Sequence, residues 1–99
     1  MEKLRNQVDQ IHDELFKLFI QRIRLTEKIW IEKIQSNVSF VDLNREINLL
    51  HRHDQSQEFA QCPELQIAYH QFIQAMIDIN KRYLTTYIEK QKNKADYAK

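Results

Sequence analysis

Apolar residues recur along the first third of the chain at spacings of three and four residues. The positions that set this spacing are Leu4, Val8, Ile11, Leu15, Leu18, Leu25 and Ile29. Such a spacing places the side chains on one face of an α-helix. No helix-breaking residue interrupts the pattern before Gln35, so it predicts one helix over roughly residues 3–35. At 1.5 Å per residue this helix would be about 50 Å long.

A helix of this length is too long for one small domain to cover. A compact domain of about 100 residues has a radius of gyration near ~13 Å. Much of the helix must therefore project from its own chain with its apolar stripe still present. A second copy of the chain is the simplest cover for that stripe, so we expect a symmetric homodimer.

Two more helices are predicted downstream. Ser36 to Val41 is polar enough for a loop, and Asp42 is the expected N-cap of a helix that ends in the polar run 53–57. Pro63 suits the start of a third helix. Its apolar positions are Leu65, Tyr69, Phe72, Met76, Ile79 and Tyr83. The expected fold is all-α, with three helices in a domain over residues 1–92 and a polar, fraying tail over 93–99.

Composition narrows the possible functions. Gly is absent, which excludes glycine-rich phosphate loops, and 15 basic residues balance 14 acidic ones, so no net field favours nucleic acid or an anionic membrane. Cys62 is the single cysteine, which excludes an internal disulfide and fits a reducing compartment. The N-terminus has no apolar signal region and no stretch is long enough to span a membrane. We therefore expect a cytoplasmic protein.

Charged residues interrupt the apolar stripe of the first helix. The spacing from Leu18 continues through Arg22 and Lys33, which places two cations on a face expected to be buried. A buried charge needs a partner, so these cations require an anion from elsewhere. The alternative is that both reach the surface or pair with carboxylates of another helix.

A second group of charges opens the next helix. Asp42, Arg45 and Glu46 stand at positions i, i+3 and i+4 and share one side of the first turn. On their own, they could be a helix cap with a local ion pair, worth about 0.3–0.5 kcal/mol.

Together these charges resemble a known family. The pattern consists of Leu4-Arg5, Asp9-x-x-x-x-Glu14-Leu15, Arg22, Lys33 and Asp42-x-x-Arg45-Glu46. Over roughly residues 4–50 it is similar, without insertion, to the all-helical chorismate mutases of the AroQ class. The resemblance implies an intertwined homodimer with two equivalent sites. Each site would be lined by the three helices of one chain and by an arginine from the first helix of the other chain.

The resemblance also implies the chemistry and the role of each residue. Chorismate would rearrange to prephenate without metal or cofactor, because fixed charges hold the substrate and stabilise the transition state. Arg22 and the partner subunit's Arg5 would bind the two carboxylates, and Lys33 would donate to the ether oxygen. Arg5 and Arg22 are about 25 Å apart along one helix, too far to hold one small molecule from the same chain, and an antiparallel partner could bring its own Arg5 alongside Arg22.

The remaining roles fall to the second helix. Glu46, with the backbone near Asp42, would hold the ring hydroxyl of chorismate. Arg45 would orient Glu46 or add positive potential.

The third helix departs from the family pattern. The family usually has a small polar or aliphatic residue there and, one turn later, a glutamine or glutamate that meets the ether oxygen. Residues 75–88 contain neither Gln nor Glu. The two positions fall either on Ile79 and Tyr83 or on Asn80 and Leu84. Tyr83 could donate through its hydroxyl and Leu84 could not, and a lost donor typically lowers the rate by about 10²–10³.

Two other functions use the same scaffold. An isochorismate-pyruvate lyase would need a similar set of cations, although Arg45-Glu46 favours the mutase. A non-catalytic helical dimer would explain the altered third helix. His51, His53 and His70 form no compact ligand pattern along the sequence, so no metal site is predicted.

Overall fold

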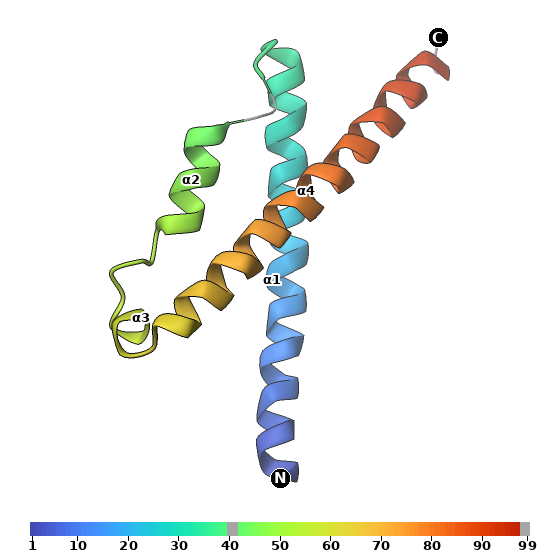
Figure 1. The fold of residues 1–99 in the computed structure, drawn as a ribbon. Helices are drawn as coiled ribbons and strands as arrows, with labels where there is room; N and C mark the ends of the chain where they lie inside the picture. Colours follow the sequence, from blue (N-terminus) through green and yellow to red (C-terminus); the bar gives the residue numbers. More distant parts are fainter. Residues whose placement is uncertain (40–41, 98–99) are drawn as a thin grey trace.

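The computed structural model describes residues 1–39 and 42–97, with side chains up to residue 94, and all of its regular structure is helical (Figure 1). The helices are α1 (Glu2–Gln35), α2 (Leu43–His51), α3 (Gln57–Gln61) and α4 (Pro63–Tyr97). The molecule is elongated, with a radius of gyration of 17.6 Å and extents of 57 × 34 × 15 Å. The helix bounds confirm the prediction of an all-α chain with a long N-terminal helix, and α4, with 35 residues, is about as long as α1, with 34.

Local sequence signals set most helix boundaries. Asn37 adopts a left-handed conformation with φ of 56° just beyond α1, a conformation that Asn tolerates better than most residues. Asp42 caps α2 as predicted, because its Oδ1 accepts a hydrogen bond from the backbone N–H of Arg45 at 3.0 Å. Pro63 begins α4, also as predicted. Within the predicted loop over residues 36–41, Phe40 and Val41 lie outside the described residues.

The predicted number of helices is wrong by one. The polar run after α2 contains Ser56, whose side-chain oxygen accepts a hydrogen bond from the backbone N–H of Phe59 at 3.4 Å and caps the short helix α3. Phe59 is buried in this helix, which gives the short segment a hydrophobic contact. The Ser56 cap was overlooked because the run is polar throughout.

The C-terminal segment is also more helical than expected. Helix α4 continues to Tyr97, so the predicted tail begins as part of this helix, and its fraying stays a prediction. Ala98 and Lys99 lie outside the described residues. Because α4 crosses residue 92 without a break, the division of the chain at that residue stays a prediction.

Helices α1, α2 and α3 each pack on α4, which crosses α1 near the middle of both helices (Figure 1). The core is small. Its buried apolar residues are Ile23, Phe59, Ile73, Ile77, Leu84 and Ile88. Most of them belong to α4, so this helix forms the centre of the core, and the other three helices pack on it. Within the described part of the chain, no helix is both long and apolar enough to cross a membrane.

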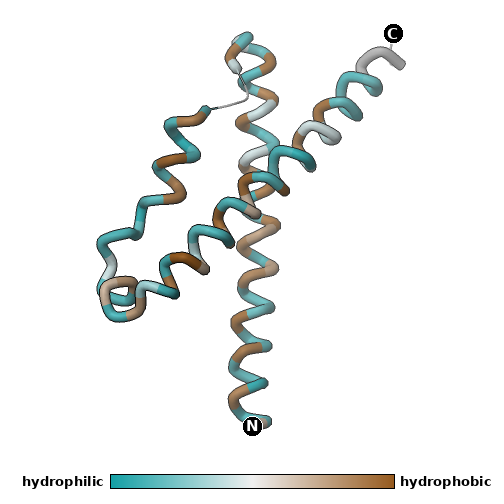
Figure 2. The backbone as a smooth tube through the Cα atoms, viewed as in Figure 1, coloured by the Kyte–Doolittle hydropathy of each residue, from teal (hydrophilic) through white to brown (hydrophobic). Residues whose placement is uncertain are grey.

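The face of α1 that packs on α4 is different from the apolar stripe seen in the sequence. The stripe residues Leu4 and Leu15 are 65% and 48% exposed, whereas Ile23 and Glu27 are the buried residues of α1. At about 100° per residue, Ile23 and Glu27 lie roughly 100–140° around the helix from the stripe. The lower part of α1 therefore carries hydrophobic residues that the chain itself leaves uncovered (Figure 2).

Candidate functional site

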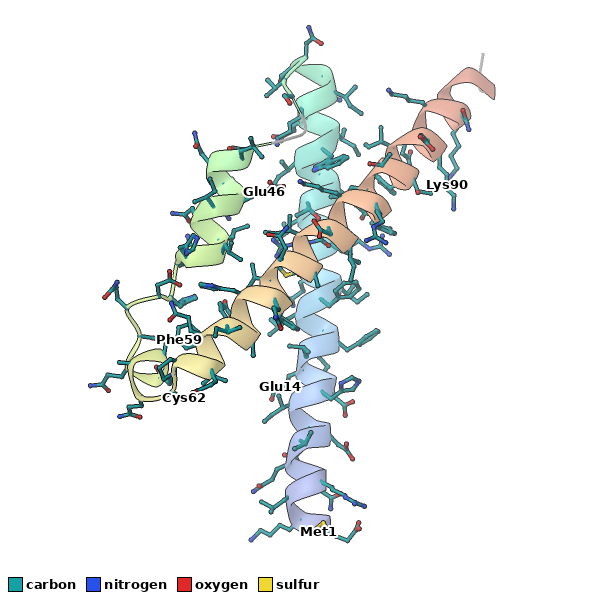
Figure 3. All side chains as sticks on the ribbon, in the orientation of Figure 1. Met1, Glu14, Glu46, Phe59, Cys62 and Lys90 are labelled. Atoms are coloured by element: carbon teal, nitrogen blue, oxygen red, sulfur yellow. The ribbon has the colours of Figure 1, made fainter. Side chains whose placement is uncertain are left out.

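A groove of about 440 Å³ lies in the angle between the first half of α4 and the part of α1 that precedes the crossing. Most of its lining is apolar and includes Leu15, Leu18 and Phe19 of α1 and Phe72, Met76 and Ile79 of α4. Its polar lining residues are His12, Arg22 and Asn80. Below the crossing, the side chains of α1 point outward around the whole helix (Figure 3).

Arg22 lies at the crossing end of this groove and is half-buried. Its Nη1 atom is buried and has no hydrogen-bond partner among the described residues. Burial, and then the nearby positive charge of Arg45, lower the pKa of Arg22. Two cations from α1 and α2 therefore lie near each other, and a buried guanidinium donor beside the groove has no partner among the described residues, which is an arrangement that suits an anionic ligand.

Glu46 faces α4. Its carboxylate forms an ion pair with the Lys81 ammonium group, which joins the first turn of α2 to the middle of α4. The Glu46 side chain is 22% exposed and that of Lys81 is 39% exposed, so the pair is partly shielded from solvent. Lys81 could not be predicted from the sequence, because no local spacing relates a residue of α4 to one of α2.

The other predicted charged residues lie outside the groove lining that contains Arg22. Arg5 is on the projecting part of α1 with a 69% exposed side chain and lies 3.9 Å from Glu2, far along the helix from Arg22. Lys33 is half-buried near the end of α1. Asp42 and Arg45 are exposed at the start of α2. One chain thus brings Arg22 and Arg45 together and leaves Arg5 distant from both.

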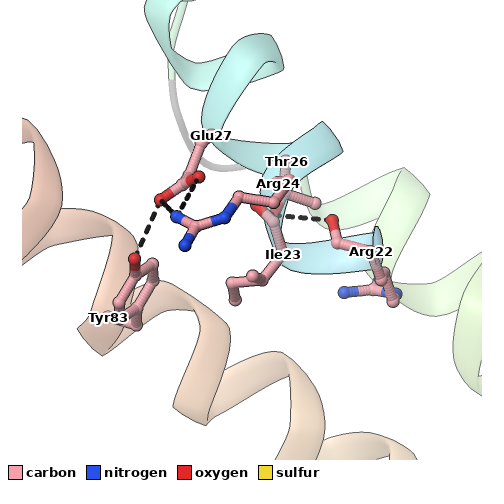
Figure 4. Close-up of polar contacts among 6 residues, drawn as sticks. All are labelled: Arg22, Ile23, Arg24, Thr26, Glu27 and Tyr83. Atoms are coloured by element: carbon pink, nitrogen blue, oxygen red, sulfur yellow. Dashed lines mark hydrogen bonds and ion pairs between the residues drawn. The ribbon is translucent and has the colours of Figure 1, made fainter. Parts of the chain in front are cut away.

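Tyr83 is directed away from Arg22. Its hydroxyl donates to Glu27 Oε2 at 2.8 Å, and Arg24 Nη1 donates to both oxygens of Glu27 at 3.0 and 3.1 Å. The bond to Glu27 raises the pKa of Tyr83 and also that of Arg24. Figure 4 shows this network on one side of Ile23 and Arg22 on the other. The i, i+3 spacing of Arg24 and Glu27 was a local signal that the sequence analysis did not use.

Asn80 and Leu84 face inward on α4. Asn80 is 8% exposed and shares the groove with Arg22, and Leu84, one turn later, is 2% exposed. Ile79 also lines the groove but is 53% exposed, and Tyr83 is 41% exposed. Of the two alignments left open by the sequence, this placement favours the one that uses Asn80 and Leu84.

The histidines that seemed unrelated in the sequence do meet in space. His51 and His70 both contact the carboxylate of Asp54, and the three ligand atoms lie within 4.8 Å of one another. The expectation that these histidines lack a compact arrangement is therefore wrong. It failed because Asp54, which joins them, was not considered, and because His70 comes from a different helix.

Comparisons with known proteins give one result. A family model described as chorismate mutase type II matches residues 4–84, from the start of α1 to the middle of α4. No curated protein and no solved structure matches the chain significantly.

Proposed function

Since the chain belongs to the type II chorismate mutase family, we propose that it rearranges chorismate to prephenate in an intertwined homodimer. This reaction is unimolecular, so it needs no nucleophile and no proton relay. The protein must hold a flexible dianion in its reactive shape and stabilise the charge that develops on the ether oxygen. Fixed cations in a partly buried site serve both needs.

The state of Arg22 is the observation that most supports this function. The Arg22 guanidinium is half-buried and lies near a second cation, and one of its buried donor atoms has no partner among the described residues. This arrangement costs free energy unless an anion binds there. A forked guanidinium matches the geometry of a carboxylate. We therefore assign one carboxylate of chorismate to Arg22.

The remaining substrate contacts are assigned by the family pattern. The second carboxylate goes to the partner subunit's Arg5, and the ether oxygen goes to Lys33. Glu46 accepts the ring hydroxyl beside the backbone at Asp42. The ion pair with Lys81 supports this role, because it holds the Glu46 side chain against α4.

The third helix supplies Asn80 and no donor one turn later. In the alignment that the inward placement of Asn80 and Leu84 favours, Leu84 takes the position where the family usually has Gln or Glu. A leucine donates no hydrogen bond, so Lys33 would be the main side-chain donor to the ether oxygen. We therefore expect a mutase of low rate.

The uncovered surface of α1 supports the dimer. Leu4, Val8, Ile11, Leu15 and Leu18 are each between 48% and 65% exposed, and the last two continue into the groove beside α4. A continuous exposed stripe of this kind marks an interaction surface. A second α1, packed antiparallel, would cover the stripe and bring the partner subunit's Arg5 towards Arg22.

An activity assay on purified protein tests the function. We expect chorismate to be consumed with formation of prephenate, and Arg22→Ala to reduce this turnover by at least about 10²–10³. The melting temperature should stay the same or rise, because a poorly compensated buried charge is removed. Arg82→Ala, which removes an exposed arginine of α4, is the matched control and should leave turnover unchanged.

Three results would contradict the proposal. If Arg22→Ala keeps its turnover but loses its fold, Arg22 is a structural residue. If isochorismate releases pyruvate while chorismate is not rearranged, the protein is a lyase. If neither reaction occurs, the protein is a non-catalytic helical dimer.

A further inference from the structure

Three side chains with ligating atoms converge where the end of α2 meets α4. His51 is the last residue of α2, Asp54 lies in the following turn, and His70 is in the third turn of α4. His51 Nδ1 is 2.7 Å from Asp54 Oδ2, and His70 Nε2 is 2.7 Å from Asp54 Oδ1. Each imidazole thus uses a different oxygen of one carboxylate.

Both imidazole rings turn one nitrogen to the Asp54 carboxylate. The two imidazole rings are nearly perpendicular, at 78°, with centroids 5.0 Å apart, so they do not stack face to face. Bonds from His70, then His51, lower the pKa of Asp54 to about 2, and Gln66 adds a further hydrogen bond. The Asp54 carboxylate is thus held between two imidazole rings, and three potential ligand atoms lie within 4.8 Å of one another.

We propose that His51, Asp54 and His70 bind one divalent transition-metal ion of the zinc class. Two imidazole nitrogens and one carboxylate oxygen form a ligand set that zinc accepts, at about 2.0–2.2 Å from the ion. Calcium and magnesium prefer oxygen ligands throughout, so this set selects against them. The site is separate from the groove and from the residues assigned to chorismate.

Entry of an ion requires the three side chains to adjust their spacing. Metal–ligand bonds of about 2.0–2.2 Å in a tetrahedral site separate neighbouring ligand atoms by roughly 3.3 Å. The two His–Asp separations of 2.7 Å would have to open, and the wider spacing within the cluster, at most 4.8 Å, would have to approach this value as the ion enters. A neutral imidazole can carry its proton on the other ring nitrogen, so each ring can present a lone pair to the ion by changing tautomer.

The site is accessible from solvent. The side chains of His51, Asp54 and His70 are 52%, 24% and 27% exposed. A bound ion would connect the C-terminal end of α2 to α4, while the ion pair of Glu46 with Lys81 holds the other end. The ion would therefore fix the position of the helix along its whole length.

Metal titration of untagged, chelator-treated protein tests the site. We expect Zn²⁺ to bind at one equivalent per chain by calorimetry and to raise the melting temperature. Co²⁺ should give the visible absorption bands of a nitrogen- and oxygen-ligated ion. His70→Gln and His51→Gln should each weaken Zn²⁺ binding by at least about tenfold, since each removes one of three protein ligands. His53→Gln, which changes a neighbouring histidine outside the cluster, should bind as the parent protein does.

Several outcomes would overturn the proposal. Equal Zn²⁺ binding by the parent protein and by His51→Gln would place the ion elsewhere, and His51 is exposed enough that this variant should fold even if His70→Gln does not. No Co²⁺ spectrum and no Zn²⁺-dependent stabilisation would show that the cluster is a hydrogen-bonded contact. Equal stabilisation by Mg²⁺ would indicate a general effect of cations on acidic groups. None of these readouts depends on mutase activity.

Discussion

The two halves of α1 have the same hydrophobic spacing but different surroundings. Every residue from 2 to 19 is exposed, although the apolar stripe runs through this half without a break. In residues 20–35, Ile23 and Glu27 are buried against α4, and Arg22 and Lys33 occupy the stripe positions and are half-buried. The first half is exposed on every side, whereas the second half is buried on the face that meets α4 and carries charge on its stripe, where Leu25 and Ile29 are still 59% and 48% exposed.

This difference shows that periodicity identifies an apolar face and does not identify its partner. Helix α4 packs on a neighbouring face of α1, through Ile23 and Glu27, and leaves the stripe to a second partner. We propose that the second partner is another copy of the chain over the first half and substrate over the second. Changes to either half should therefore have distinct effects.

The largest effect should come from a charge placed on the exposed stripe. Leu15→Glu would put a carboxylate in the interface of both subunits and lose about 1.5–3 kcal/mol of side-chain burial in each. The dissociation constant of the dimer should therefore rise by about 10²–10⁴, because every 1.4 kcal/mol is tenfold. Sedimentation at micromolar concentration measures this dissociation constant. The matched control is Lys17→Glu, on the opposite face of α1, which should leave the dissociation constant unchanged.

Two observations would contradict this prediction. If Leu15→Glu sediments as the parent protein does, the interface does not use the stripe. If the parent protein is itself a monomer with full helical content, the proposed dimer and its shared site are both excluded.

A moderate effect should follow from restoring an amide on α4. Leu84→Gln should raise the mutase rate by at least about tenfold, a modest part of the 10²–10³ that a well-placed donor contributes. Burying the amide should lower stability by about 1–3 kcal/mol, so rates must be compared well below the melting temperature. Tyr83→Gln is the matched control, because adjacent helix positions point about 100° apart.

A rise in rate at position 83 and not at position 84 would show that Tyr83 faces the substrate. In that case the alternative alignment, with Ile79 and Tyr83 at the family positions, is the correct one.

The smallest effect should come from removing the Tyr83 hydroxyl. Tyr83→Phe takes one hydrogen bond from the buried Glu27, which keeps its bonds to Arg24. We expect a loss of about 1 kcal/mol in the free energy of unfolding and an unchanged rate. Chemical denaturation measures the free energy of unfolding, and the mutase assay measures the rate, with Tyr87→Phe as the control for both. A strong fall in rate would instead make the phenol a substrate donor.

Much of the fold could be predicted because its signals are local. Each of these signals relates residues within one or two helical turns. They are the hydrophobic spacing of α1, the Asp42 cap of α2 and Pro63 at the start of α4. Helix α3 was missed because its Ser56 cap is one polar residue among many. The helical tail was missed because it has few apolar positions to reveal it.

The site was less predictable because it depends on contacts between helices. Arg22 could be singled out, since a cation on an apolar stripe is conspicuous within one helix. The pairing of Glu46 with Lys81 and the meeting of Asp54 with His70 both join α4 to the segment around α2. No spacing along the chain reports such contacts, so only the structure could show them.

Subunit mixing tests the central claim most directly. Arg5→Ala and Arg22→Ala chains, each with little activity alone, are mixed, allowed to exchange subunits and assayed with chorismate. If each site takes Arg22 from one chain and Arg5 from the other, a mixed dimer has one intact site and one site that lacks both arginines. With random exchange, about one quarter of the parent activity should return. If the mixture stays as inactive as its components, the two arginines do not act across the dimer and the proposed shared site is wrong.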